Sequence, residues 1–304
     1  MVMIESAHFQ KYRALRDVAV SFAPLTAFVG PNASGKSSVL HAFAFARPLE
    51  ASDAWRHEAT DTAVSVTPNG RQTFMRKIGS AGSPLKVQLL RLDPARMKAP
   101  IAVVAASSVA EDGSNLPNVY ASLSKQDRVA VADQFRRLVP VFGDVDVRPS
   151  THAGNHGFVF EDRWATRVTY AAGDVSDGAL LVLGYLIAAF QHPPADVVAV
   201  EEPERGLHPY LLEQLIALFR KMTTGLGDRA PIQVIVATHS PDVLDHLRPE
   251  EVRFMDRDAS DGSVSITAPP TTSPEWEAAF REYRESMGEA WLSGALGGVP
   301  GAGP

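Results

Sequence analysis

Residues 30–37 have the composition and spacing of a loop that holds phosphate groups. The segment Gly30-Pro-Asn-Ala-Ser-Gly-Lys-Ser37 fits the pattern G-x-x-x-x-G-K-S. Glycines let such a loop point successive backbone N–H groups at phosphate oxygens. Lys36 is expected to reach the β- and γ-phosphates, and the Ser37 hydroxyl to bind Mg²⁺. We therefore predict an ATP site with contacts from Gly30, Asn32, Ser34, Gly35, Lys36, Ser37 and Ser38.

Two adjacent acids, Glu201 and Glu202, supply the carboxylates that such a site needs. They follow the apolar run 197–200, and parallel strands deliver the side chains at their carboxyl ends to a nucleotide crevice. Neighbouring residues of a strand face opposite sides, so one carboxylate can face the metal while the next reaches the attacking water. We assign Glu201 to the magnesium ion and Glu202 to the general base.

Short apolar runs separated by turn signals must position these residues. The runs 25–29, 197–200 and 232–237 are typical of strands buried on both faces, and 17–22 of a half-buried strand. Helical apolar spacing follows at 36–47, 179–190 and 210–222. This alternation predicts an α/β fold with a mostly parallel sheet covered by helices.

Two further segments have helical spacing outside this alternation. Residues 124–139 predict an amphipathic helix capped by Ser124, with Val129 and Phe135 on its apolar face. A second helix is expected to start at Ser273 and to pack on the chain's own core or, alternatively, to dock on a partner. Its apolar stripe consists of Trp276, Phe280, Tyr283 and Met287. Residues 256–262 predict a turn between two short strands, and the Gly- and Pro-rich end, 297–304, a loose tail.

Four motifs in order resemble those of the ABC-type AAA ATPases. In chain order, the first is the opening Phe9-Gln-Lys-Tyr-Arg13-Ala-Leu together with the phosphate loop, and the second is Val175-Ser-Asp-Gly178. The third is Glu201-Glu-Pro-Glu-Arg-Gly-Leu-His-Pro209, and the fourth is Val236-Ala-Thr-His239-Ser-Pro. The family includes the ATPase heads of overcoming-lysogenization-defect nucleases and of many antiphage systems, and is related to RecF and chromosome-maintenance heads. The resemblance spans about 2–270 and implies a P-loop NTPase with an ABC-ATPase-like head and a smaller inserted lobe.

The resemblance also implies that two copies of the chain share each nucleotide. Ser176, Asp177 and Gly178 would belong to a signature turn that caps the γ-phosphate of ATP bound to a second subunit. The loop 204–208 would cross the dimer interface with Glu204, Leu207 and His208. Backbone N–H groups at the start of the helix after Gly178 are a physical reason for phosphate binding there.

The remaining site residues are also implied by the resemblance. His239 would be the switch histidine that touches the γ-phosphate, and Arg13 would flank the nucleotide. The chain departs from the pattern in two respects: Glu201 stands where most ABC proteins have Asp, and the glutamine that helps to hold the metal is not obvious. Gln88 is the first candidate for it and Gln72 the alternative.

Composition excludes several other classes of protein. The 304 residues contain no cysteine, which rules out disulfides, thiolate zinc sites and a cysteine nucleophile, and fits a cytoplasmic protein. The N-terminus lacks the pattern of a secretory signal, and the longest apolar run, 179–190, is too short to cross a bilayer. We therefore expect no membrane association.

Charge is unevenly distributed along the chain. The formal net charge is −6, yet residues 71–98 carry seven basic side chains and one acid. This segment predicts either a solvated surface of a small lobe or a groove for a phosphate backbone, and the second reading would make DNA a partner.

The motifs divide the chain into three parts. Residues 1–85 and 175–270 are expected to form the nucleotide-binding lobe, 86–174 an inserted lobe that leads to the signature turn, and 271–304 a C-terminal helix with its tail. No heptads predict coiled-coil arms. The pairs Asp144/Asp146 and Asp256/Asp258 have nuclease-like spacing but are interpreted as turn residues.

The function that follows is an ATP-driven switch in which a homodimer closes around Mg-ATP and opens after hydrolysis. We expect the ATPase subunit of a DNA-repair or antiphage defence system that acts with DNA or with a separate effector, such as a nuclease or a toxin. The alternative is a slowly hydrolysing sensor that controls a partner protein. A small-molecule kinase is a third reading, but the sequence has no signal for an acceptor pocket.

Overall fold

A computed structural model describes residues 2–44, 48–57, 61–80, 84–151 and 153–296. In this part of the chain, a six-stranded central sheet has the order β14-β13-β3-β12-β11-β6. All neighbouring strands are parallel except β14, which runs antiparallel to β13. The strands are β3 (Leu25–Val29), β6 (Val87–Leu90), β11 (Val197–Glu201), β12 (Gln233–Thr238), β13 (Val252–Arg257) and β14 (Val264–Thr267).

Both faces of this sheet are covered, as the continuous apolar runs indicate. On β12, Val234 and Val236 belong to one buried cluster, whereas Ile235 and Ala237 belong to the other. The first cluster contains α5 (Asp177–Phe190), α6 (Pro209–Thr224) and α7 (Pro241–Asp245); the second contains α1 (Lys36–Ala42). A strand buried on both faces gains from apolar residues at every position, which confirms the prediction of an α/β fold with a parallel sheet.

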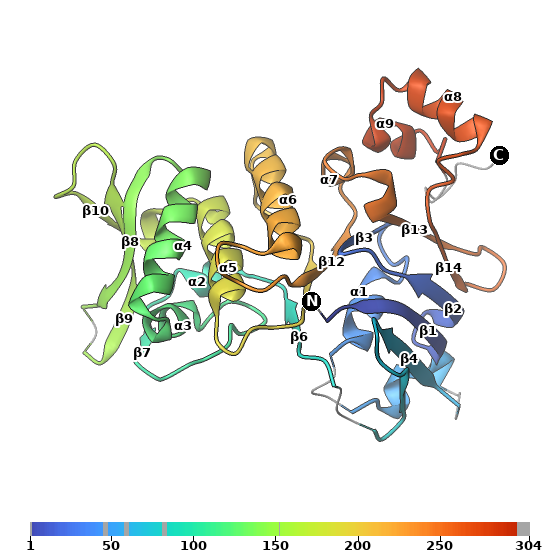
Figure 1. The fold of residues 1–304 in the computed structure, drawn as a ribbon, viewed down its shortest axis with the longest axis horizontal. Coiled ribbons are helices and arrows are strands. Elements are labelled where there is room, and N and C mark those ends of the chain that lie inside the picture. The colour runs from blue at the N-terminus through green and yellow to red at the C-terminus, as the bar shows by residue number, and fades with distance from the viewer. Residues whose placement is uncertain (1, 45–47, 58–60, 81–83, 152, 297–304) are drawn as a thin grey trace.

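A second sheet covers the α1 side of the molecule. It is antiparallel, with the order β2-β1-β4-β5, and Figure 1 shows it in blue below the C-terminal helices. Its strands are β1 (Ile4–Tyr12), β2 (Leu15–Ser21), β4 (Ala63–Pro68) and β5 (Phe74–Lys77). The expected helix 36–47 ends as α1 at Ala42, and residues 45–47 lie outside the described residues.

The inserted lobe lies at the opposite end of the molecule (Figure 1). It consists of α2 (Pro94–Met97), β7 (Ile101–Ala102), α3 (Leu116–Ser122), α4 (Lys125–Leu138), β8 (Phe142–Pro149), β9 (Asn155–Asp162) and β10 (Thr169–Ala171). Ser124 caps α4 by accepting a hydrogen bond from the Asp127 amide. Val129 is 54% exposed, contrary to the prediction, because the buried face of α4 runs through Val131 and Phe135.

The boundary between the lobes differs from the expectation. We placed residues from 86 onward in the inserted lobe, but β6 pairs with β11 inside the central sheet. The central lobe therefore extends through Leu90. Short 3-10 turns at Ala51–Asp53, Trp55–His57, Ala172–Asp174 and Pro249–Glu251 connect the main elements.

The C-terminal stripe forms two helices instead of one. α8 (Pro274–Glu282) and α9 (Met287–Leu292) are separated by Arg284 and Glu285, which both have positive φ. Asp245 of α7 accepts hydrogen bonds from the Ser286 hydroxyl and the Gly288 amide. The helix pair thus packs on α7 (Figure 1), which favours the core reading of the stripe. The expected loose tail, 297–304, lies outside the described residues. None of the described helices has the length and apolar character needed to cross a membrane.

Candidate nucleotide site

The carboxyl ends of four parallel strands meet at one edge of the central sheet. The phosphate loop follows β3, Arg91 follows β6, Glu201 ends β11 and His239 follows β12. In the strand register, Glu201 lies opposite Ala237, and Thr238 lies opposite Val29. The topology therefore brings together residues that are far apart in the sequence.

The phosphate loop depends on two glycines with no room for a side chain. A Cβ atom on Gly30 would lie 2.5 Å from the Met255 carbonyl oxygen, and Gly35 has φ of +98°. Lys36 is buried, and its ammonium donates hydrogen bonds to the carbonyl oxygens of Gly30 at 2.8 Å and Pro31 at 2.7 Å. Burial lowers the pKa of Lys36, while Glu202, Glu204 and Glu201 oppose this shift.

The other loop residues differ in their exposure. Asn32 and Ser37 are exposed and Ser38 is half-buried, whereas Ser34 is buried with its hydroxyl 3.5 Å from the Lys36 ammonium. The loop thus has polar side chains both at the surface and in its buried interior.

The Ser37 hydroxyl and the Glu201 carboxylate meet directly. Ser37 Oγ donates a short hydrogen bond to Glu201 Oε1, and the Glu201 side chain is only 9% exposed. A hydroxyl oxygen and a carboxylate oxygen are the hard donors that Mg²⁺ prefers, and this ion usually takes few protein ligands besides phosphate oxygens and water. The donor set at this point therefore fits a magnesium ion.

Glu202 and His239 also lie side by side. His239 Nδ1 is 3.4 Å from Glu202 Oε1, and both side chains are partly exposed. The Glu202 amide donates a hydrogen bond to the Ala237 carbonyl, and Glu202 has φ of +47°. A left-handed conformation at a residue with a side chain costs roughly 1–3 kcal/mol and is often found at functional sites. The packing of β11 against β12 holds this conformation.

Glu204 turns inward, which corrects its expected place at a subunit interface. One of its oxygens accepts hydrogen bonds from the Thr238 hydroxyl at 2.6 Å and the His239 amide at 3.4 Å. The other oxygen is buried and has no hydrogen-bond partner among the described residues. Burial raises the pKa of Glu204 above the ordinary value. Glu204 thus supports the backbone that carries His239.

Gln88 does not reach the metal position, which is a second correction. In the register it lies opposite Val198, well before the end of β11. Its amide donates to the Val109 carbonyl at 2.8 Å, and its oxygen accepts from Gln191. The alternative, Gln72, is exposed near the start of β5 in the antiparallel sheet. Arg91, which sequence reasoning did not single out, instead follows β6 beside Glu201.

The signature turn begins α5 and touches the loop before α6. Ser176 caps the helix by accepting from the Ala179 amide at 3.4 Å, and Asp177 pairs with Lys98 at 2.6 Å. A Cβ on Gly178 would lie 3.1 Å from Leu207. The exposed His208 caps α6 by accepting from the Tyr210 amide. The signature turn and the loop 204–208 therefore form one continuous surface.

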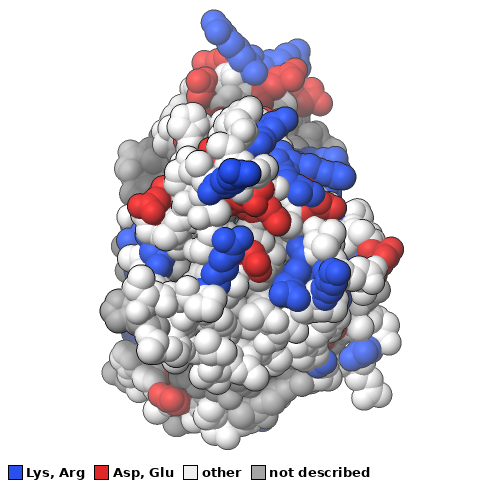
Figure 2. Space-filling model, turned by 90° about the vertical axis from the view of Figure 1, so that its left-hand side faces the viewer, with Lys and Arg blue, Asp and Glu red and all other residues white. Residues whose placement is uncertain are grey.

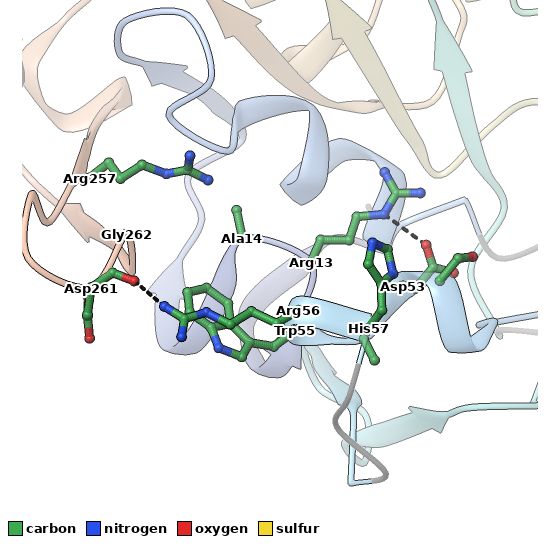
Figure 3. Close-up of a pocket in the computed structure, with 11 residues that line it drawn as sticks. Arg13, Ala14, Asp53, Trp55, Arg56, His57, Arg257, Asp261 and Gly262 are labelled. Carbon is green, nitrogen blue, oxygen red and sulfur yellow. Dashed lines mark hydrogen bonds and ion pairs between the residues drawn. The ribbon is translucent and has the colours of Figure 1, made fainter.

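A cavity of about 620 Å³ opens between the turn after β1, the segment 52–57 and the turn between β13 and β14 (Figure 3). Arg13 lines it and is fixed by an ion pair with the buried Asp53 at 2.8 Å. Arg56 lies over the Trp55 ring and donates to the Asp261 carbonyl. Gly35 connects this region to the phosphate loop, since a Cβ there would contact Val264 and Ala14. The cavity thus combines an aromatic ring with polar groups. Arg13 was expected from the resemblance to flank the nucleotide, whereas Trp55 was not singled out from the sequence.

The basic segment 71–98 does not form one groove. Arg76 is buried and donates to the Ala42 carbonyl, Arg91 faces Glu201, and Lys98 pairs with Asp177. These three side chains contact groups of the chain itself, whereas Arg71, Lys77, Lys86 and Arg96 are exposed. On the end face formed by the inserted lobe, Lys and Arg side chains are interspersed with Asp and Glu (Figure 2). The prediction of a phosphate-backbone groove therefore rests on the exposed basic residues of the segment alone.

Comparisons with known proteins agree with this geometry. A family model described as "AAA domain, putative AbiEii toxin, Type IV TA system" matches residues 91–245. This range includes the signature turn, both acids and His239, and excludes the phosphate loop. No curated protein matches the sequence.

Solved structures of SMC heads share the fold. An SMC head bound to the C-winged helix domain of ScpA has a TM-score of 0.59 at 13% identity, covering 87% of this chain and 97% of its own. The SMC head domain from Thermotoga maritima has a TM-score of 0.53 at 14% identity, covering 87% and 98%. An SMC head with an extended coiled coil, bound to the C-terminal domain of ScpA from Pyrococcus furiosus, has a TM-score of 0.56 at 12% identity, covering 94% and 99%.

Proposed function

Because this chain belongs to the AAA-domain family whose model it matches and has the fold of an SMC head, we propose that it binds and hydrolyses Mg-ATP. The observation that carries the proposal is the contact between Ser37 and Glu201. A phosphate-loop hydroxyl and a strand-end carboxylate meet, and Glu202 and His239 stand beside them.

Each residue has a role that its surroundings support. Lys36 would exchange its two carbonyl partners for phosphate oxygens, and the loop amides would hold the rest of the triphosphate. Ser37 and Glu201 would hold Mg²⁺, which supplies neutralisation of the phosphate charge. Glu202 would accept a proton from the attacking water, and His239 would donate a hydrogen bond to the terminal phosphate.

The cavity beside Arg13 is proposed as the place of the nucleoside. Trp55, which has Arg56 over one face of its ring, would stack on a base with the other face, and the Asp53 carboxylate holds Arg13 at the cavity wall. Aromatic stacking of this kind tolerates different bases, so the site favours ATP less by its base than by the phosphates.

Closure of the site is proposed to need a second copy of the chain. The Ser176 turn and the loop with Leu207 and His208 lie together at the surface, where a partner's triphosphate could be capped. A homodimer would then hold two nucleotides between its subunits and separate after hydrolysis.

The wider role is proposed by analogy. Two of the SMC heads above are bound to a domain of ScpA, and we propose that this chain likewise controls a separate effector, in DNA repair or antiphage defence and in the cytoplasm. For DNA contact, the exposed basic residues of segment 71–98 are the first surface to test. Measuring DNA binding with ATP at several salt concentrations tests this: binding that weakens steeply with salt is expected from phosphate contacts.

Turnover of the Glu202→Gln variant tests the proposed reaction. We expect the variant to bind Mg-ATP as the unmodified chain does, but to hydrolyse it about 10²–10⁴ times more slowly, because the water loses its base. Lys36→Ala is the matched control for binding and should lose affinity for ATP itself. Equal turnover in Glu202→Gln and the unmodified chain, at a very slow rate, would instead favour a sensor over an enzyme.

A further inference from the structure

The residue that follows β6 is Arg91, three positions after Gln88, which was the first candidate for the metal-holding glutamine. β6 and β11 are parallel, with Leu90 opposite Val200. Arg91 is therefore the next residue beside Glu201 at the carboxyl edge of the sheet. Its backbone amide donates to the Glu111 carbonyl at 2.8 Å, which fixes the start of its side chain.

The Arg91 side chain connects two parts of the site. Its Nε atom lies 3.9 Å from Glu201 Oε2, the oxygen that does not accept from Ser37. The side chain is 56% exposed, so it has room to move. It also lines a cavity of about 580 Å³, together with Asp177 of the signature turn and Arg205 and Gly206 of the loop before α6.

We propose that Arg91 is a further residue of the nucleotide site, which holds Glu201 while no metal is bound and turns to the terminal phosphate when Mg-ATP binds. This inference rests on the proposed function. A guanidinium near a metal ligand competes with the incoming cation through like-charge repulsion. Its planar donors also suit phosphate oxygens. A glutamine has no charge, so it can neither balance Glu201 nor compete with magnesium.

Substitution of Arg91 by glutamine separates these two effects. In Arg91→Gln, the Mg²⁺ concentration that half-saturates binding of a fluorescent ATP analogue should fall about tenfold, because a positive charge beside the metal position is removed. Turnover at saturating Mg²⁺ and ATP should fall roughly 100-fold, because a charged donor to the phosphate is lost.

Two further variants serve as controls. Arg91→Lys keeps the charge without the planar group. Its Mg²⁺ midpoint should stay near that of the unmodified chain, while its turnover should be reduced as in Arg91→Gln. Arg96 lines the same cavity, and none of its described contacts involves Glu201; Arg96→Gln should change neither quantity. Thermal melting of each variant checks that it is folded, and Mg²⁺ alone should raise the melting temperature of Arg91→Gln more than that of the unmodified chain.

Unchanged Mg²⁺ midpoint and turnover in Arg91→Gln would overturn the inference and reduce the contact to a surface ion pair, while leaving the proposed ATPase intact. Failure of the unmodified chain to bind the ATP analogue at any Mg²⁺ concentration would contradict the proposed function, and this inference with it.

Discussion

At the scale of single residues, the site consists of basic and acidic side chains that lie close to one another and offset each other's charge. Lys36 is buried among backbone carbonyls and three acids, and Glu201 is shared by Ser37 and Arg91. Glu204 is the exception, because one of its oxygens is buried without a partner among the described residues. Its carboxylate is thus held at an energetic cost.

Replacement of Glu204 by glutamine should therefore stabilise the chain. Burial raises the pKa of Glu204, so the folded state binds a proton more tightly than the unfolded state does. The wild-type protein then loses stability as pH rises through that folded pKa, whereas the neutral glutamine does not. At pH 8 we expect the free energy of unfolding of Glu204→Gln to exceed that of the unmodified chain by about 1–3 kcal/mol, and its melting temperature to be higher. Both differences should shrink toward pH 5.

The Thr238 hydrogen bond provides the control for this prediction. Glu204→Gln keeps an acceptor for the Thr238 hydroxyl, but Glu204→Ala removes it and should destabilise the chain. A lower melting temperature for Glu204→Gln at pH 8 would show that the charge of Glu204 is stabilising, contrary to our account.

At the scale of elements, the strands that carry the site were predictable from the sequence and the side-chain directions at their ends were not. β3, β11 and β12 are buried on both faces, so their sequences are continuously apolar. The inward turn of Glu204 depends on Thr238, and the direction of Gln88 depends on Gln191, which is 103 residues away. Such contacts form only in the folded chain, and no local pattern encodes them.

The C-terminal helices show the same limit. The spacing of Trp276 and Phe280 correctly predicts a helix, and the rings stack at 5.9 Å. The break before α9 requires left-handed backbone at Arg284 and Glu285, residues that carry no turn signal of the kind glycine gives. Helix propensity therefore predicts one continuous helix across Arg284 and Glu285, whereas docking on α7 requires a break into two helices.

Substitution of Gly288 by alanine tests the docking of α9 on α7. A Cβ at this position would lie 2.5 Å from the Pro241 carbonyl oxygen, which is backbone and cannot move aside freely. We expect Gly288→Ala to lower the free energy of unfolding by about 1–3 kcal/mol, measured by chemical denaturation. Gly173→Ala is the matched control, because a Cβ at Gly173 meets no atom within 4 Å. Equal stability of the two variants would mean that α9 does not pack on α7 in solution.

At the scale of the whole molecule, the phosphate loop and the signature turn begin different helices of the fold. The loop with Lys36 follows β3 in the central lobe, whereas Ser176 begins α5 next to the inserted lobe. We propose that the phosphate loop of one copy and the signature turn of a second copy bind the same ATP, which then holds the two molecules together. Dimer formation should therefore require both the triphosphate and an intact Ser176 turn.

Light scattering on the Glu202→Gln variant, with and without a Ser176→Arg substitution, tests this claim most directly. With Mg-ATP we predict that Glu202→Gln has twice the mass that it has with ADP, because slow hydrolysis leaves the ATP that joins the two copies intact. The double variant should bind ATP with similar affinity yet keep the mass of the ADP state, since the arginine blocks the cap. A mass that does not depend on ATP, or a dimer that forms equally well in the double variant, would contradict the shared site.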